Sequence, residues 1–171
     1  GWLDLYLRYA GSSEIAKAQA LLLDSRYSHL SLGEVSSVVG DNKYDKLYID
    51  KINNLVLQSG YTETRVGTLS KKLEYDGSYG SFSVDDIPAN FESVDVNTRY
   101  MGVKLGIEDG ANYYLQGKVS YGGLDYNEDN FTNKKRIIEN NSQEIEGFVG
   151  KNESPSSRVN VTASYGSVRL Q

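Results

Sequence analysis

The sequence predicts an all-β protein: a single-stranded parallel β-solenoid of about eight coils of 17–22 residues, expected to be right-handed, with a β-hairpin insertion near the C-terminus. Two observations predict this fold. Tyrosines recur at steps of 18, 17, 17, 18, 21, 21 and 44 residues, and a period near twenty is typical of repeat architectures. Residue types also alternate before each tyrosine with the period of two that marks a strand. The coils are centred on Tyr9, Tyr27, Tyr44, Tyr61, Tyr79, Tyr100, Tyr121 and Tyr165.

Composition narrows the classes of function that the chain can have. Its 171 residues fit one domain, 1–171, with a continuous core. The chain has no cysteine, which excludes disulfides, zinc–thiolate sites and cysteine nucleophiles. The net charge is −5 without a basic block, and no window approaches 18 consecutive apolar residues. We therefore predict no nucleic-acid partner and no transmembrane segment.

The first element is a strand over residues 2–9, where Leu3, Leu5, Leu7 and Tyr9 alternate with polar or amphipathic residues. The next segment, residues 13–22, has a composition that favours helix. The register of the neighbouring repeats instead places it across a loop and a strand. We expect the repeat to override the helical propensity.

Each later coil is predicted to contain two short strands, a bend and a connecting loop. Six and four residues before the tyrosine the side chains are mostly large and apolar, and two residues before it they are usually small. Apolar residues return three and five positions after the tyrosine, and this odd step requires a bend, for which Ser28, Gly80, Gly122 and Gly166 are suited. Strand parity points the tyrosines inward, so we expect them to form one column packed inside the corner. The alternative is an exposed platform for sugars or peptides.

The step of 44 residues contains the insertion, residues 127–157, which is polar and rich in Asn, Lys and Glu. Segments 136–139 and 144–149 flank two asparagines and predict a β-hairpin that covers one end of the solenoid. No comparable cap precedes Leu3. We expect either that coils N-terminal to this chain are missing or that the chain forms an edge-mediated homodimer. The chain begins with Gly1, which fits a removed signal peptide or a cloning remnant.

Three segments carry a resemblance to a known family: 24–33 (DSRYSHLSLG), 94–107 (VDVNTRYMGVKLGI) and 159–170 (VNVTASYGSVRL). The chain resembles the bacterial putative-adhesin domains, a group that includes head-GIN and toast-rack-like β-solenoids. The resemblance implies an exported protein of the periplasm or outer cell surface. It implies no known catalysis, and the family offers no active site to carry over.

No catalytic, cofactor-binding or metal site is predicted. His29 occupies an outward strand position without ligand or catalytic partners, and we expect it on the solvated surface. The acid pairs at 85–86, 108–109 and 128–129 are expected to be turn residues, because calcium requires six to eight converging oxygens. The single tyrosines that we expect to point outward, as a weak candidate binding surface, are Tyr48, Tyr113 and Tyr114.

The sequence favours a non-enzymatic cell-envelope module: an adhesin, a scaffold or a partner-binding domain with an unknown protein or glycan partner. The alternative is a carbohydrate-binding or polysaccharide-cleaving β-helix, in which Asp24, Asp41 and Asp76 could stack on one face. A third possibility is a sensor or anti-sigma-type periplasmic domain. The lack of an acid/base constellation and of a cofactor motif in the sequence favours the first over the second, and the third depends on gene neighbourhood.

Overall fold

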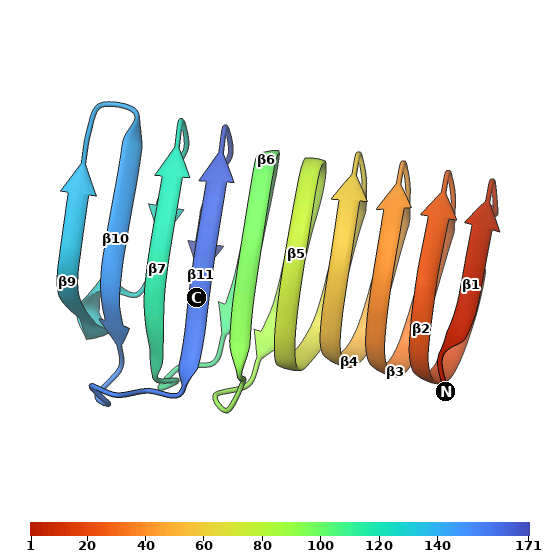
Figure 1. Cartoon of the computed structure of the whole chain (residues 1–171), viewed down its shortest axis with the longest axis horizontal. Coiled ribbons are helices and arrows are strands. Elements are labelled where there is room, and N and C mark those ends of the chain that lie inside the picture. The colour runs from red at the N-terminus through yellow and green to blue at the C-terminus, as the bar shows by residue number, and fades with distance from the viewer.

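The computed structural model describes residues 1–171 and shows the predicted all-β solenoid of parallel stacked coils, with about six turns (Figure 1). The only helical element is a short 3-10 turn, η1 (Glu128–Asn130). The strands are β1 (Leu3–Arg8), β2 (Ser13–Arg26), β3 (His29–Lys43), β4 (Lys46–Gly60), β5 (Glu63–Ile87), β6 (Ser93–Ile107), β7 (Tyr113–Ser120), β8 (Leu124–Asp125), β9 (Phe131–Ile138), β10 (Ser142–Val149), β11 (Ser157–Ser164) and β12 (Val168–Leu170).

Strands β2 to β6 bend around the coil without ending, so each contains 14 to 25 residues. The sequence predicted two short strands and a loop in each coil. The structure instead continues the backbone pairing through the second bend, which satisfies the backbone N–H and C=O groups that a loop would leave to water. Segment 13–22, with its helical composition, lies in β2, and the prediction that the repeat overrides propensity is confirmed.

The register of the parallel strands follows the spacing of the tyrosines. Leu3 of β1 is paired with Leu21 of β2, Leu21 with Val38 of β3, and Leu55 of β4 with Leu73 of β5. Like residues therefore lie above one another from coil to coil. The turns number about six rather than eight because the coils of Tyr121 and Tyr165 are built from short pieces, β7 with β8 and β11 with β12.

The order of the strands in space departs from their order in the chain near the C-terminus. The sheet runs β1-β2-β3-β4-β5-β6-β11-β7-β10-β9, so β11 lies between β6 and β7 (Figure 1). It pairs in parallel with both neighbours. Beyond β7, strands β10 and β9 form the predicted antiparallel hairpin and end the sheet on that side.

The core is one continuous cluster of 37 buried residues that runs along the solenoid. Its central column lies six positions before every ladder tyrosine except Tyr9 and is at most 1% exposed: Leu21, Val38, Leu55, Leu73, Val94, Val159 and Leu115. Gly40 lies between Leu23 and Leu57, and an added Cβ would come within 3.1 Å of both side chains. These three residues belong to the neighbouring column, four positions before the tyrosines, where one glycine accommodates the two leucines on either side of it.

Candidate functional site: an exposed tyrosine ladder

Eight tyrosines form a single stack of rings along the solenoid, which we call the tyrosine ladder. Neighbouring ring centroids are 4.7 to 5.0 Å apart, and the ring planes differ by 9° or less. In spatial order the ladder is Tyr9, Tyr27, Tyr44, Tyr61, Tyr79, Tyr100, Tyr165 and Tyr121. The prediction of one tyrosine column is confirmed.

The prediction that this column packs inside the corner is wrong. The ladder rings are 45% to 77% exposed, the largest value belonging to Tyr9 at the end of the stack. Each ladder tyrosine has a φ between 50° and 58°, in the left-handed region of backbone conformation. This conformation breaks the alternation of an extended strand, so the ring faces solvent although the residues two and four positions earlier face the core.

The left-handed conformation costs free energy, and the stacking contacts between the ladder rings do little more than offset that cost. For a bulky side chain the cost is about 1–2 kcal/mol per residue. One stacked aromatic pair returns about 0.5–1.5 kcal/mol beyond area burial. The Tyr27 N–H also donates a 3.1 Å hydrogen bond to the Lys43 carbonyl of the next coil, and Tyr44 repeats this contact with Gly60 at 3.0 Å. Eight strained and exposed aromatic residues are thus kept without a clear gain in stability.

Buried polar side chains support the bend beneath the ladder in the N-terminal coils. Ala10 N–H donates to Ser28 Oγ at 3.0 Å, Ser28 N–H to Asp45 Oδ1 at 2.8 Å, and Asp45 N–H to Thr62 Oγ1 at 3.3 Å. Burial raises the pKa of the Asp45 carboxyl, and contacts with Ser25, Ser28 and the Arg26 charge oppose this rise. Each coil therefore caps the backbone of the coil before it.

In the C-terminal coils the same position is occupied mainly by glycine. A Cβ on Gly80, Gly166 or Gly122 would collide with the backbone carbonyl of the residue that lies beneath it in the stack. The bend is thus stabilised by side-chain caps at one end of the molecule and by close backbone approach at the other.

Charged residues line the ladder on the side of the preceding strand. Arg8 Nη2 lies 3.1 Å from Asp24 Oδ1, and Arg26 reaches Asp41 at 3.2 Å. Asp24 and Asp41 are paired neighbours, but Gln58 lies between Asp41 and Asp76. The structure brings together only two of the three acids that the sequence suggested could stack, and both are engaged by arginines.

The three single tyrosines predicted to face outward behave differently. Tyr48 on β4 is 40% exposed, and its hydroxyl donates to Glu63 at 3.3 Å. Tyr114 on β7 is half-buried and its hydroxyl donates to Glu146. Tyr113 is 3% exposed and packs near Phe91, so its predicted outward direction is wrong. Adjacent residues of a strand point to opposite faces, so Tyr113 and Tyr114 cannot both face solvent.

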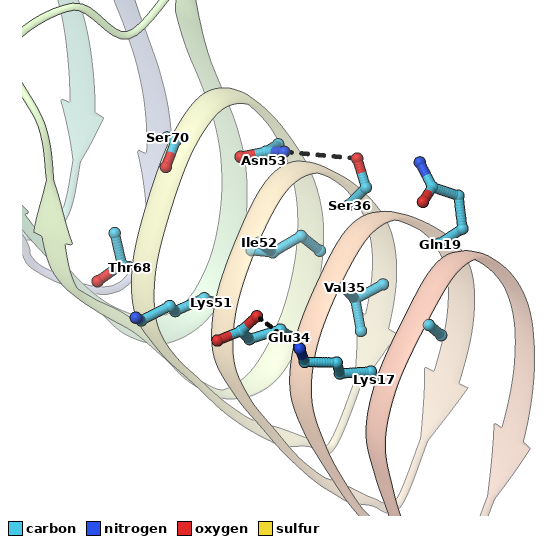
Figure 2. A pocket seen from close by; sticks show the side chains of 11 residues that line it. Lys17, Gln19, Glu34, Val35, Ser36, Lys51, Ile52, Asn53, Thr68 and Ser70 are labelled. Atoms are coloured by element: carbon cyan, nitrogen blue, oxygen red, sulfur yellow. Dashed lines mark hydrogen bonds and ion pairs between the residues drawn. The ribbon is translucent and has the colours of Figure 1, made fainter.

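A shallow cleft of about 630 Å³ crosses four coils away from the ladder (Figure 2). Lys17, Glu34 and Lys51 lie in line along it, with Lys17 Nζ 4.0 Å from Glu34 Oε2. Asn53 Nδ2 donates to Ser36 Oγ at 3.4 Å in the next column. This cleft was not predicted from the sequence, although the repeat register aligns these polar residues and could have revealed it.

The remaining candidates are surface groups. His29 is exposed, as predicted. Among the acid pairs, Glu108 accepts a 2.6 Å hydrogen bond from Ala89 N–H, and Glu128 contacts Arg136 at 3.4 Å. The structure contains no group of three or more His, Cys, Asp or Glu side chains placed to hold a metal ion. No helix in it combines the length and the hydropathy needed to cross a membrane.

Comparison with known proteins gives one distant structural neighbour. No family model matches the chain, and no curated protein does. The fold is similar to the crystal structure of a putative cell adhesion protein from Clostridium sporogenes ATCC 15579, with a TM-score of 0.41 and 14% sequence identity. The likeness covers 76% of this chain and 55% of the other, so the chain spans about half the length of that neighbour.

Proposed function

We propose that the chain is a non-enzymatic binding module of the bacterial cell envelope, an adhesin or scaffold, and that the tyrosine ladder is its contact surface. The observation that supports this proposal is the ladder itself: eight exposed rings held in a strained backbone conformation. Strain that persists without stabilising the fold is characteristic of functional positions. The resemblance of the repeat motif to adhesin domains supports the envelope location.

The geometry of the ladder limits what kind of partner can bind it. Each inner ring lies between two others, so its faces meet aromatic neighbours while its edge and hydroxyl are turned to solvent. The tyrosine hydroxyls that bond to other side chains are those of Tyr48, Tyr75 and Tyr114, none of which is in the ladder. The ladder therefore offers a row of free hydroxyls on rings whose centroids are about 4.8 Å apart. This row fits an extended partner that follows the solenoid axis and contacts several rings together.

The test replaces three adjacent ladder residues by asparagine in one variant, Tyr27→Asn/Tyr44→Asn/Tyr61→Asn. Asparagine tolerates the left-handed conformation, so the bends remain while the rings are removed. Beads coated with the wild-type chain, the triple variant or the control Tyr48→Asn are applied to peptide and glycan arrays. We expect the triple variant alone to lose binding by tenfold or more. Equal binding by all three proteins would remove the ladder as the contact surface.

The second candidate function is carbohydrate binding, and the cleft of Figure 2 favours it. Its aligned amide, hydroxyl and ammonium groups are the kinds of donor and acceptor that sugar hydroxyls need. In this case Lys51→Ala/Asn53→Ala would abolish the signal on the glycan array, and the triple ladder variant would retain it. An assay for unsaturated uronate products separates binding from cleavage, because glycan binding without product excludes a polysaccharide lyase.

A further inference from the structure

The tyrosine ladder repeats with a nearly constant step over its whole length. Neighbouring ring centroids are 4.7 to 5.0 Å apart in all seven steps. The step has this size because each coil stacks on the next at the spacing of hydrogen-bonded strands. Every rung also presents the same chemical group, a tyrosine ring edge with its hydroxyl. Such a surface favours a partner that repeats its own groups at the same spacing.

The ladder is also nearly untwisted, which is unusual for a stack of strands. Adjacent strands of an ordinary sheet are rotated by about 20–25° relative to each other. Neighbouring ladder rings differ by 9° or less, and the strands beside them stand almost parallel in one row (Figure 1). So little twist over many strands is typical of amyloid-like stacks and of sheets held flat by side-chain ladders. A straight partner can therefore follow the whole ladder.

Extended partners differ in how well their own repeat matches the ladder step. A cross-β fibre repeats identical side chains every ~4.7–4.8 Å along its axis, which agrees with the ladder. An α-helix repeats every ~5.4 Å, so its mismatch with the ladder grows to about 4 Å over the seven steps. One face of an extended peptide repeats every ~6.6 Å and falls out of step sooner. A polyproline helix repeats every ~9.3 Å and would meet only every second ring.

We propose that the partner of the ladder is a cross-β fibre whose axis lies parallel to the solenoid axis, so that successive tyrosines meet equivalent side chains of successive fibre chains. This inference rests on the proposed function of the ladder and names the class of its partner. One ring makes a single weak contact, but many contacts form together when the two repeats agree. Binding therefore requires the assembled fibre, because a soluble chain of the same sequence supplies one rung only.

The row of residues directly before the ladder tyrosines adds a preference for charge. It runs in register along the solenoid and contains four cations and no acid: Arg8, Arg26, Lys43, Gly60, Ser78, Arg99, Ser164 and Ser120. Aspartates contact the first two cations, whereas Lys43 and Arg99 are exposed and have no ion pair in the chain. A column of carboxylates along the fibre would pair with these free cations. The proposed partner is therefore a fibre with an acidic side column.

Co-sedimentation with synthetic fibrils tests the proposal on the wild-type chain. Two fibrils are grown from one short cross-β peptide that carries either glutamate or lysine at its outward position. We expect the chain to pellet with the glutamate fibrils and to bind them roughly tenfold more tightly than the lysine fibrils. The same glutamate peptide, kept unassembled by a central proline, should not compete even in large excess. Competition by the soluble peptide, equal binding to both fibrils or binding to neither would overturn the proposal.

Variants of the chain locate the contact with the fibril. The triple ladder variant should bind the glutamate fibrils roughly tenfold more weakly or worse, and Tyr48→Asn should bind them as the wild type does. Lys43→Glu/Arg99→Glu should weaken binding by a similar factor. The matched control Lys71→Glu/Arg158→Glu changes exposed cations away from the ladder and should have no effect. Thermal melts confirm that each variant is folded. Unchanged pelleting of the folded triple variant would place the contact elsewhere and overturn the proposal.

The outcomes separate this inference from the proposed function on which it rests. A chain that binds the peptide or glycan arrays through its ladder but ignores the fibrils would keep the ladder as a contact surface and exclude a cross-β partner. Tighter binding to a soluble polyproline peptide than to the fibrils would also exclude it, in favour of contact at every second ring. A triple variant that keeps both array and fibril binding would exclude the inference and the proposed function together.

Discussion

The ladder tyrosines and the two buried tyrosines, Tyr75 and Tyr113, show that one residue type has two roles in this solenoid. All occur in coils of the same repeat. The ladder rings are stacked on the surface, whereas Tyr75 and Tyr113 are each 3% exposed and belong to the core. The difference lies in the backbone, because only the ladder residues have a positive φ. Among these ten tyrosines, a positive φ accompanies a ring on the surface and its absence accompanies a ring in the core.

The environment of Tyr75 explains the glycine that lies two positions before the ladder residue Tyr79. Its ring stacks on Phe82 with centroids 4.0 Å apart. Its hydroxyl lies 4.0 Å from the sulfur of Met101. A Cβ on Gly77 would be 2.6 Å from the same hydroxyl. In this coil the small residue makes room for the buried ring of Tyr75, not for the ladder ring of Tyr79.

The largest effect should come from Tyr75→Ala, which leaves a cavity beside Phe82. We expect a loss of about 3–5 kcal/mol in the free energy of unfolding, as for other large aromatic truncations in cores. Chemical denaturation followed by circular dichroism measures this loss. A change below about 1 kcal/mol would contradict the assignment of Tyr75 to the core.

The second effect is a loss of stability in alkali. Burial raises the pKa of Tyr75 to about 12, and burial likewise raises the pKa of Tyr113 to about 12. Each folded-state pKa lies above the unfolded value near 10, so the unfolded chain loses its protons first as the pH rises. Stability should therefore fall between about pH 10 and pH 12, by about 2–3 kcal/mol for each ring.

Ultraviolet titration of tyrosinate checks this result. Two of the fourteen tyrosines should ionise only near pH 12, or together with unfolding. Tyr75→Phe should remove one of these two ionisations. A titration in which no tyrosine ionises late would contradict the burial of both rings.

The third effect is that of Gly77→Ala, which should cost about 1–3 kcal/mol because the added methyl group meets the Tyr75 ring. The same change at Gly102, where a Cβ would have open space, should alter stability by less than about 0.5 kcal/mol. Combining Gly77→Ala with Tyr75→Leu should remove most of the additional cost, because leucine occupies the equivalent position at Leu57. Purely additive losses would show that the two side chains do not compete.

The smallest effect is expected for Tyr79→Asn in the ladder. Loss of two stacking contacts and relief of the left-handed strain are of similar size, so stability should change by less than about 1 kcal/mol. This differs from the inward-packed ring that strand parity predicted, whose truncation would have cost several times more. A loss of 3 kcal/mol or more in a thermal or chemical melt would restore the inward packing.

The solenoid class and the tyrosine column could be predicted from the sequence because each depends on a repeated spacing. The hairpin could be predicted because two strand-like segments flank a turn at two asparagines. The direction of the ladder rings could not be predicted, because strand parity assumes an extended backbone. No residue type in Arg26-Tyr27-Ser28 indicates that Tyr27 has a positive φ. The burial of Tyr113 was missed although its neighbour Tyr114 already required opposite directions. The cleft could not be found from any single coil, because it depends on the register of several coils at once.

The position of β11 has a consequence for the order in which the protein can assemble. Strands β1 to β6 can stack one after another as they are synthesised. Strand β7 and its hairpin are made earlier than β11 but reach β6 only through it. Residues 157–171 are therefore needed to join β7 and the hairpin to the rest of the sheet. Until the ribosome has synthesised them, β7 lacks the strand that connects it to β6. Coil assembly is sequential along most of this protein and waits for the last strands at its far end.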